Sequence, residues 1–156
     1  MRDVIPGFAY YKSQQTGVIQ RENPFYHPDQ RLDISQVYAK DKNNIWLNNF
    51  VPMIQDWREA KGTELKVLDV GCNMGILVEG ANGEGFDVKG IDINRLSIDV
   101  GKKEFPTIAD KLSVDDFTQP QSEKNIYDVV VLSDVLSHVG NPMNLLNNTL
   151  QVLKED

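Results

Sequence analysis

A glycine-containing turn between two apolar runs is the part of this sequence with the clearest chemical use. Residues 66–77 read KVLDVGCNMGIL, with an acid, Asp69, two residues before Gly71 and a second glycine at Gly75. This pattern predicts a strand, a tight turn and a helix that begins at the turn. The first amides of a helix lack intrahelical partners, and glycine lets backbone approach a ligand closely. The segment therefore predicts a pocket for a nucleotide-type ligand.

A second carboxylate follows about twenty residues after the turn. Residues 86–92 read FDVKGID and predict a short strand that ends at Asp92. At this place in a parallel α/β fold, an acid can accept hydrogen bonds from two ribose hydroxyls, and such charge-assisted bonds are stronger than neutral ones. We expect Asp92 to bind a ribose rather than to be an ordinary solvated acid.

The spacing of the glycines separates two classes of nucleotide ligand. A dinucleotide-binding turn has the pattern G-x-G-x-x-G, whereas here Asn73 replaces the second glycine and Gly75 comes one residue early. Nicotinamide binding is therefore disfavoured. The run from Asp69 to Gly75 resembles motif I of the class I S-adenosylmethionine (SAM) dependent methyltransferases, acid-x-Gly-x-Gly-x-Gly. Asn73 is the one departure, and because asparagine tolerates positive φ we expect the turn to keep its shape.

The resemblance implies SAM as cofactor and S-adenosylhomocysteine (SAH) as product. It implies that Asp92 binds the ribose and that Asp116, or alternatively Asp115, accepts a hydrogen bond from the adenine amino group. Phe117 would pack beside the adenine ring. Ser133, at the end of a later strand, would lie near the methionine part of SAM. The full set of implied cofactor-binding residues is Asp69, Gly71, Cys72, Asn73, Gly75, Asp92, Ile93, Asp116, Phe117 and Ser133.

No catalytic residue can be assigned from the sequence. The segment that follows Ser133 and Asp134 carries His138, whose unperturbed pKa is close to neutrality, as a general base requires. A histidine at this place can equally be structural. Many methyl transfers need only positioning and no dedicated base.

The elements that must position these residues alternate between strands and helices. Strands are predicted at 66–70, 86–92, 111–114 and 127–134, with helices after the turn from 74 to 81, after Asn94 as cap, and after Asn141-Pro142. Met143, Leu146, Leu150 and Leu153 would line one face of the last helix. The fold class predicted from the resemblance is α/β: a three-layer, doubly wound, mostly parallel, Rossmann-like sheet of about four core strands.

Residues 1–62 are predicted to form an N-terminal helical and irregular arm, and residues 63–156 the SAM-binding core of one structural domain. The first 33 residues would be irregular and packed on the domain, or a lid with Tyr26, His27 or Arg31 at the pocket. Residues 33–60 predict a helix that Pro52 should kink or divide and that Gly62 should stop. Its apolar stripe, expected to pack against the sheet, is Trp46, Phe50, Ile54 and Trp57.

The resemblance covers residues ~64–154, about the SAM-binding half of a full methyltransferase domain, so we expect a truncated fold. The family's strand order would leave residues 129–132 at an exposed, apolar sheet edge. Such an edge invites pairing. We expect a second copy, a different subunit or the N-terminal arm to cover it, unless the chain is a piece of a longer protein.

Composition excludes several classes of function. The net charge of −7 argues against nucleic acid as a partner. One cysteine and two histidines cannot form an internal disulfide or a usual structural zinc site, so no metal is expected. No apolar run is long enough for a membrane span or a signal peptide. A cytoplasmic location is the default expectation.

Two functions follow from the resemblance. The first is a SAM-dependent methyltransferase that acts on a small-molecule acceptor. The alternative is a SAM- or SAH-binding module or fragment that has no activity of its own and needs a partner chain.

Overall fold

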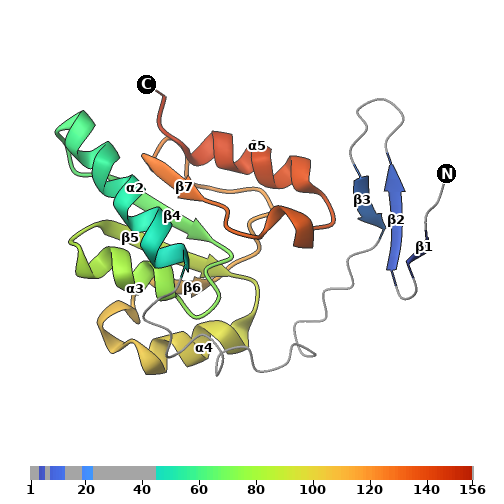
Figure 1. Ribbon diagram of the computed structural model, residues 1–156, viewed down its shortest axis with the longest axis horizontal. Helices are drawn as coiled ribbons and strands as arrows, with labels where there is room; N and C mark the ends of the chain where they lie inside the picture. Colours follow the sequence, from blue (N-terminus) through green and yellow to red (C-terminus); the bar gives the residue numbers. More distant parts are fainter. Residues whose placement is uncertain (1–3, 6–7, 13–18, 23–44, 156) are drawn as a thin grey trace.

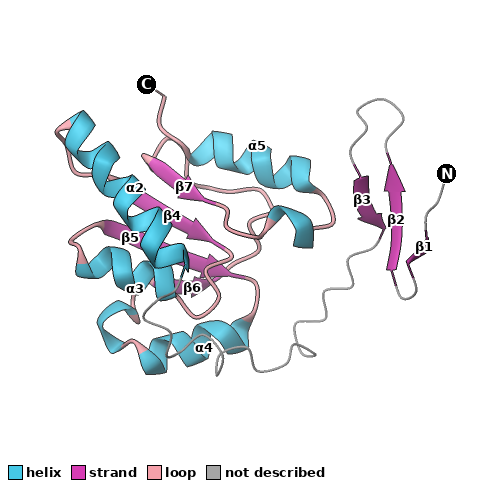
Figure 2. Ribbon diagram, viewed as in Figure 1, coloured by secondary structure: helices cyan, strands magenta, loops and turns pink. Residues whose placement is uncertain are grey.

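The computed structural model describes residues 4–5, 8–12, 19–22 and 45–155, with side chains from residue 49 onward. Figures 1 and 2 show helices packed on a four-stranded sheet, and a second, smaller sheet near the N-terminus. The described elements are β1 (Val4–Ile5), β2 (Phe8–Lys12), β3 (Ile19–Glu22), α2 (Ile45–Lys61), β4 (Lys66–Val70), α3 (Ile76–Gly83), β5 (Asp87–Asp92), α4 (Arg95–Glu104), η2 (Pro106–Ile108), β6 (Leu112–Val114), β7 (Val129–Val131), η3 (Leu136–His138) and α5 (Pro142–Val152).

The larger sheet has the strand order β6-β5-β4-β7, and all its strand pairs are parallel. Asp69 of β4 lies in register with Gly90 of β5 on one side and Val131 of β7 on the other. The predicted order, with β4 inside and β7 at an edge, is confirmed. β7 is shorter than the predicted strand 127–134, because the chain turns after it and reaches a left-handed conformation at Asp134 (φ 54°).

Helices cover both faces of this sheet, so the predicted three-layer α/β architecture is confirmed. Val67 and Leu68, as neighbours in β4, point to opposite faces. On the Val67 face, the core includes residues of α2, α3 and α4, whereas on the Leu68 face it includes residues of α5. Among the described residues, no helix is both long and apolar enough to cross a bilayer.

The stripe predicted for the helix before β4 is only partly correct. In α2, Val51 and Ile54 are buried, but Trp57 is 51% exposed and the side chain of Trp46 lies outside the described residues. The face turned to the core continues at Arg58, whose guanidinium lies 4.4 Å from the centre of the Phe86 ring. Residues 51, 54 and 58 have helical spacing, so position 57 falls outside the buried stripe.

The ends of α2 follow sequence rules more closely than its faces do. Gly62 follows the helix with φ +64° and donates its N–H to the Arg58 carbonyl, so the predicted stop is confirmed. Pro52 lies inside a helix that the structure describes without interruption from Ile45 to Lys61, so it does not divide the helix.

The apolar stripe predicted for the last helix is largely exposed, and a different stripe is buried. Asn141 caps α5 as predicted, since its side chain accepts from the amides of Met143 and Asn144. The buried side chains are Leu145, Thr149 and Val152, whereas Met143 is 60% and Leu150 71% exposed. Both stripes have helical periodicity, so spacing alone could not distinguish them. The exposed apolar stripe is Met143, Leu146 and Leu150.

β1, β2 and β3 form an antiparallel sheet of their own. The prediction of an irregular arm is wrong for these strands. Tyr26, His27 and Arg31, proposed for a lid, lie outside the described residues.

Asp128, just before β7, joins three separate segments. Its carboxylate accepts the Lys66 amide at 2.8 Å and the Lys154 ammonium at 2.7 Å, and its own amide donates to the Lys66 carbonyl. Burial opposes ionisation, but the bonds from Lys154 and Lys66 hold the pKa of Asp128 below its usual value.

Candidate functional site

The turn after β4 lies at the edge of the sheet where all four parallel strands have their carboxyl ends. The amides of Gly71 and Cys72 donate to the Ile91 carbonyl at 2.8 and 3.0 Å, and the Gly75 amide donates to the Cys72 carbonyl. Asn73 has φ 55°, which confirms that asparagine supplies the left-handed conformation there. The helix α3 begins two residues later than predicted, after Gly75.

Both glycines of the turn face close protein neighbours. A Cβ at Gly71 would lie 2.4 Å from Val135 Cγ2, and one at Gly75 would lie 2.7 Å from Leu112 Cδ2. Both residues also have positive φ. Packing and conformation therefore require glycine at these positions, whether or not a ligand approaches. Sequence reasoning missed both packing partners, since only the fold brings them to the turn.

Asp92, at the end of β5, is fixed by two backbone amides. Its Oδ2 accepts from the Asn73 amide at 2.9 Å, and its Oδ1 accepts from the Asn94 amide at 2.7 Å. Asn94 in turn caps α4 as predicted, through bonds from Leu96 and Ser97. A carboxylate offers about four acceptor positions, so two remain for further donors such as ribose hydroxyls.

Asp69 has a different environment from Asp92. Its side chain is 4% exposed, and burial, with a further contribution from the charge of Asp92, raises its pKa to about 8. The thiol of Cys72 is buried as well, and burial together with the nearby Asp69 raises its pKa. The ends of β4 and β5 thus bring two acids close together, Asp69 buried and Asp92 partly buried.

The residues expected near adenine, Asp116 and Phe117, follow β6, which neighbours β5 in the sheet. Ile93 is 44% exposed, but Phe117 is 4% exposed and packs in the core with residues of α5. The Asp116 carboxylate accepts from Thr118, through both its amide and its hydroxyl, and from the Gln119 side chain. Partial burial opposes ionisation of Asp116, but these bonds lower its pKa. A role of Asp116 and Phe117 in adenine binding stays a prediction.

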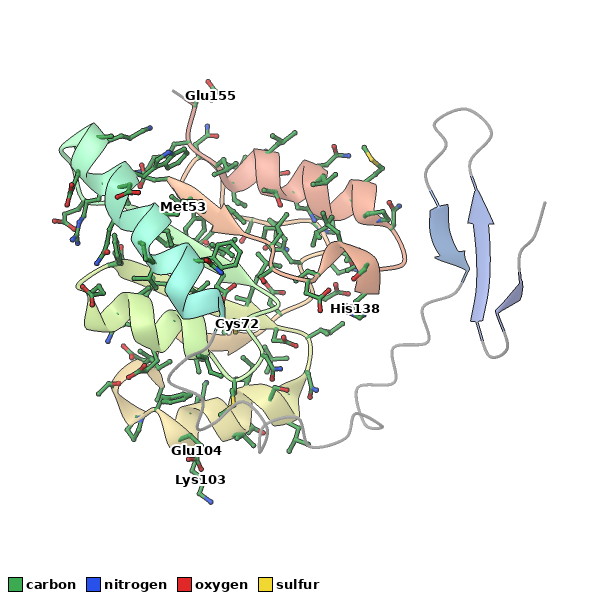
Figure 3. The ribbon with its side chains drawn as sticks, in the orientation of Figure 1. Met53, Cys72, Lys103, Glu104, His138 and Glu155 are labelled. Atoms are coloured by element: carbon green, nitrogen blue, oxygen red, sulfur yellow. The ribbon has the colours of Figure 1, made fainter. Side chains whose placement is uncertain are left out.

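The segment after β7 packs directly on the turn. Ser133, two residues after β7, is half-buried, and Val135 fills the space over Gly71. Asp134 Oδ2 lies 3.6 Å from Nε2 of His138, and the Ser137 hydroxyl donates to Asp134 Oδ1 at 3.3 Å. Figure 3 labels Cys72 and His138, one on each of the two segments that meet here. His138 is exposed, and it belongs to the segment that contacts the turn through Val135.

The strand order gives this edge a further property. From β4 the chain proceeds to β5 and β6 on one side, and then crosses to β7 on the other. Ligands of open α/β sheets bind in the crevice at such a reversal, outside the carboxyl ends of the strands. In the part of the chain that the structure describes, no group of three or more His, Cys, Asp or Glu residues could hold a metal ion.

Comparison with known proteins identifies the family of this chain. Residues 33–156 match a family described as a methyltransferase domain. The chain is similar to the ubiquinone biosynthesis O-methyltransferase of Actinobacillus pleuropneumoniae: 33% identity over 115 residues, which are 67% of this chain and 49% of that enzyme. The chain spans about half or less of the length of the curated relatives it matches.

Solved structures show the same fold at lower sequence identity. One is a SAM-dependent methyltransferase from Methanosarcina mazei, with a TM-score of 0.54, 22% identity, and coverage of 66% of this chain and 52% of that one. Another is magnesium protoporphyrin IX methyltransferase from Synechocystis with bound SAH, with a TM-score of 0.51, 23% identity, and coverage of 64% and 48%. These likenesses support the Rossmann-like fold predicted from the sequence.

Proposed function

Because this chain belongs to the class I SAM-dependent methyltransferases, we propose that it binds SAM at the carboxyl edge of its parallel sheet and transfers the methyl group to a small molecule. The chain spans only about half of its curated relatives, so both the activity and the acceptor are proposals.

The geometry of Asp92 is the observation that carries this proposal. Its carboxylate is held by the Asn73 and Asn94 amides at the end of β5, with acceptor positions left for two ribose hydroxyls. The hydrogen bond from the Asn73 amide to Asp92 also holds the turn at a fixed position relative to the proposed ribose site. The proposed roles along the cofactor are the turn from Asp69 to Gly75 and Ser133 for the methionine part, and Ile93, Asp116 and Phe117 for the adenine.

The chemistry that the cofactor supplies is a methyl group on a sulfonium, which an acceptor oxygen attacks in line while the C–S bond breaks and its electron pair stays on sulfur. The protein's main contribution is to hold the reactants in position. We propose an oxygen acceptor because the similar enzyme from A. pleuropneumoniae is named an O-methyltransferase. His138, oriented by Asp134, is the candidate to accept the hydroxyl proton.

The alternative function is a SAM- or SAH-binding module that needs a partner chain. The exposed apolar stripe of α5, together with β7 at the edge of the sheet, favours it. We propose that a second copy or another subunit covers β7. Sedimentation and amide exchange test this: a single monomeric species with rapid exchange at residues 128–133 contradicts it.

Calorimetric titration tests the cofactor. We expect SAM and SAH to bind and NAD not to bind. Asp92→Ala should abolish SAM binding, whereas Asp99→Ala, an exposed acid on α4, is the matched control and should leave it unchanged. Unchanged affinity in Asp92→Ala would refute the ribose assignment.

Turnover separates the enzyme from the binding module. The chain is incubated with methyl-labelled SAM and a panel of phenols and catechols, alone and with candidate partner chains. Methylated product from the chain alone supports the enzyme, and product that appears only with a partner supports the module. A cytoplasmic location and the absence of nucleic-acid partners remain predictions from composition.

A further inference from the structure

Asn148 of α5 attaches the loop after β6 to the helix that covers one face of the sheet. Its side-chain Nδ2 donates to the Phe117 carbonyl and to the Gln119 carbonyl, both at 2.7 Å. Asn148 lies 31 residues from Phe117 and 29 residues from Gln119 in the sequence, so both bonds are tertiary contacts. Because a carbonyl oxygen can only accept, the amide nitrogen must face the loop, and both of its hydrogens are used.

The same loop contains Asp116, the acid proposed to bind the adenine amino group. Its Oδ1 accepts from the Thr118 amide at 3.0 Å and from the Thr118 hydroxyl at 2.6 Å, and its Oδ2 accepts from the Gln119 side chain at 3.2 Å. Partial burial opposes ionisation, but these bonds lower the pKa of Asp116, so the group is a carboxylate near neutral pH. A carboxylate can only accept, and Oδ2 keeps an acceptor position for one further donor.

The bonds of Asn148 and those of Asp116 act on the same three residues of the loop. Asn148 holds the carbonyls of residues 117 and 119, and Asp116 is held by groups of residues 118 and 119. Outside this stretch, the buried Phe117 ring and the bond from Gln151 to the Gln121 carbonyl at 2.8 Å attach the loop as well. Without Asn148 these two attachments remain, but the backbone between them, which carries the donors to Asp116, loses its fixed position.

We propose that Asn148 is a positioning residue for base specificity: by holding the Phe117 and Gln119 carbonyls, it keeps the Asp116 carboxylate directed at the amino group of adenine. The inference rests on the proposed function and concerns the specificity of the same site. A carboxylate attracts an amino group and repels an oxo oxygen at the same place on a purine. The site should therefore prefer adenosyl compounds over inosyl compounds, and Asn148 should control this preference rather than the affinity for both.

Calorimetric titration of the intact chain with two ligands tests the inference. SAH and S-inosylhomocysteine differ in the purine, where inosine carries an oxo group in place of the amino group. We expect the natural chain to bind SAH about 10- to 100-fold more tightly, which corresponds to one hydrogen bond to a charged group. In Asn148→Ala this preference should fall to about threefold or less, through weaker binding of SAH and with nearly unchanged binding of S-inosylhomocysteine.

Asn147→Ala is the matched control, because Asn147 is the neighbouring asparagine of α5 and its side chain is exposed. This variant should keep the full preference for SAH. Three results overturn the inference: equal affinities of the natural chain for the two ligands, an unchanged preference in Asn148→Ala, or an equal weakening of both ligands in that variant. Absence of SAH binding to the natural chain overturns the proposed function itself.

A second measurement uses the natural chain and does not depend on the folding of a variant. If the bonds of Asn148 favour SAH binding, SAH must favour these bonds to the same degree. We expect saturating SAH to slow the exchange of the Asn148 side-chain amide hydrogens, measured by nitrogen-15 NMR, and S-inosylhomocysteine to slow it less. The side chain of Asn147 should show no such difference. Equal exchange of the Asn148 hydrogens in the two complexes overturns the inference.

Discussion

Gly101 of α4 provides a direct test of how the site is supported. Gly101 is buried, and a Cβ at this position would lie 2.2 Å from the carbonyl oxygen of Met74 and 2.8 Å from its carbonyl carbon. Met74 belongs to the turn that contains Asn73 and Gly75. Because the obstacle is backbone rather than a flexible side chain, Gly101→Ala must displace either α4 or the turn.

Two opposing effects determine the size of the change. Alanine in place of glycine inside a helix stabilises it by about 1 kcal/mol. Overpacking costs about 1–3 kcal/mol, and contact with backbone at this distance places the cost near the upper end. We expect Gly101→Ala to lower the free energy of unfolding by about 1–2 kcal/mol, or Tm by about 2–8 °C. It should also weaken SAM binding, because Asn73 moves with Met74.

Gly83→Ala is the matched control, since this glycine ends α3 and a Cβ there would meet nothing within 4 Å. We expect it to stabilise the protein by up to about 1 kcal/mol. Urea unfolding of both variants, with the slope checked for constancy, measures the difference. If Gly101→Ala stabilises the protein as much as Gly83→Ala, the close contact between α4 and the turn is wrong.

Three further predictions concern single side chains. Burial raises the pKa of Asp69 from 3.8 to about 8 in the folded protein, so stability should fall as the pH rises between these values, by up to about 1.4 kcal/mol per pH unit. Urea unfolding across this range measures the pH dependence of the free energy of unfolding, and in Asp69→Asn this dependence should lack the contribution of Asp69. Parallel curves for the two proteins would contradict the prediction. Asp128→Ala should lower the free energy of unfolding by about 1–3 kcal/mol in the same assay, because it leaves the partly buried Lys66 amide without its acceptor. A decrease below about 0.5 kcal/mol would speak against this role. If His138 is the base, His138→Gln should lower the rate of methyl transfer by about 10²–10⁴-fold without changing the affinity for SAM measured by calorimetry, and an unchanged rate excludes it.

The parts of the structure that follow local rules were predictable from the sequence. Asn94 and Asn141 are caps because a short polar side chain stands just before each helix. Asn73 keeps the turn because asparagine tolerates positive φ. The strand order came from the family resemblance rather than from the residues themselves, and the structure confirms it.

The choice of buried faces could not be predicted in the same way. On α5 the stripe of Leu145 and Val152 and the stripe of Met143 and Leu150 have the same periodicity, and only the position of the helix on the sheet selects the first. Trp57 is exposed for the same reason: it is apolar, but it lies at the wrong angle on α2. Composition and spacing do not contain this tertiary information.

Site residues show a similar division. Asp92 stands where the pattern places it, at the end of β5, with donors that the sequence did not reveal. The glycines of the turn were predicted to admit a ligand, whereas the structure gives them packing contacts with Val135 and Leu112.

The central place of β4 also determines the order in which the chain can fold. β5 follows β4 closely in the sequence, but Asp128, which joins β7 to the start of β4, lies 62 residues from Lys66. Closing so long a loop costs more entropy than closing the short one to β5, so we expect β7 to join last. During synthesis, the edge of β4 that pairs with β7 therefore remains unpaired until β7 has left the ribosome. Substitution of Asp128 should consequently change the rate at which the last strand docks, in addition to the stability of the finished sheet.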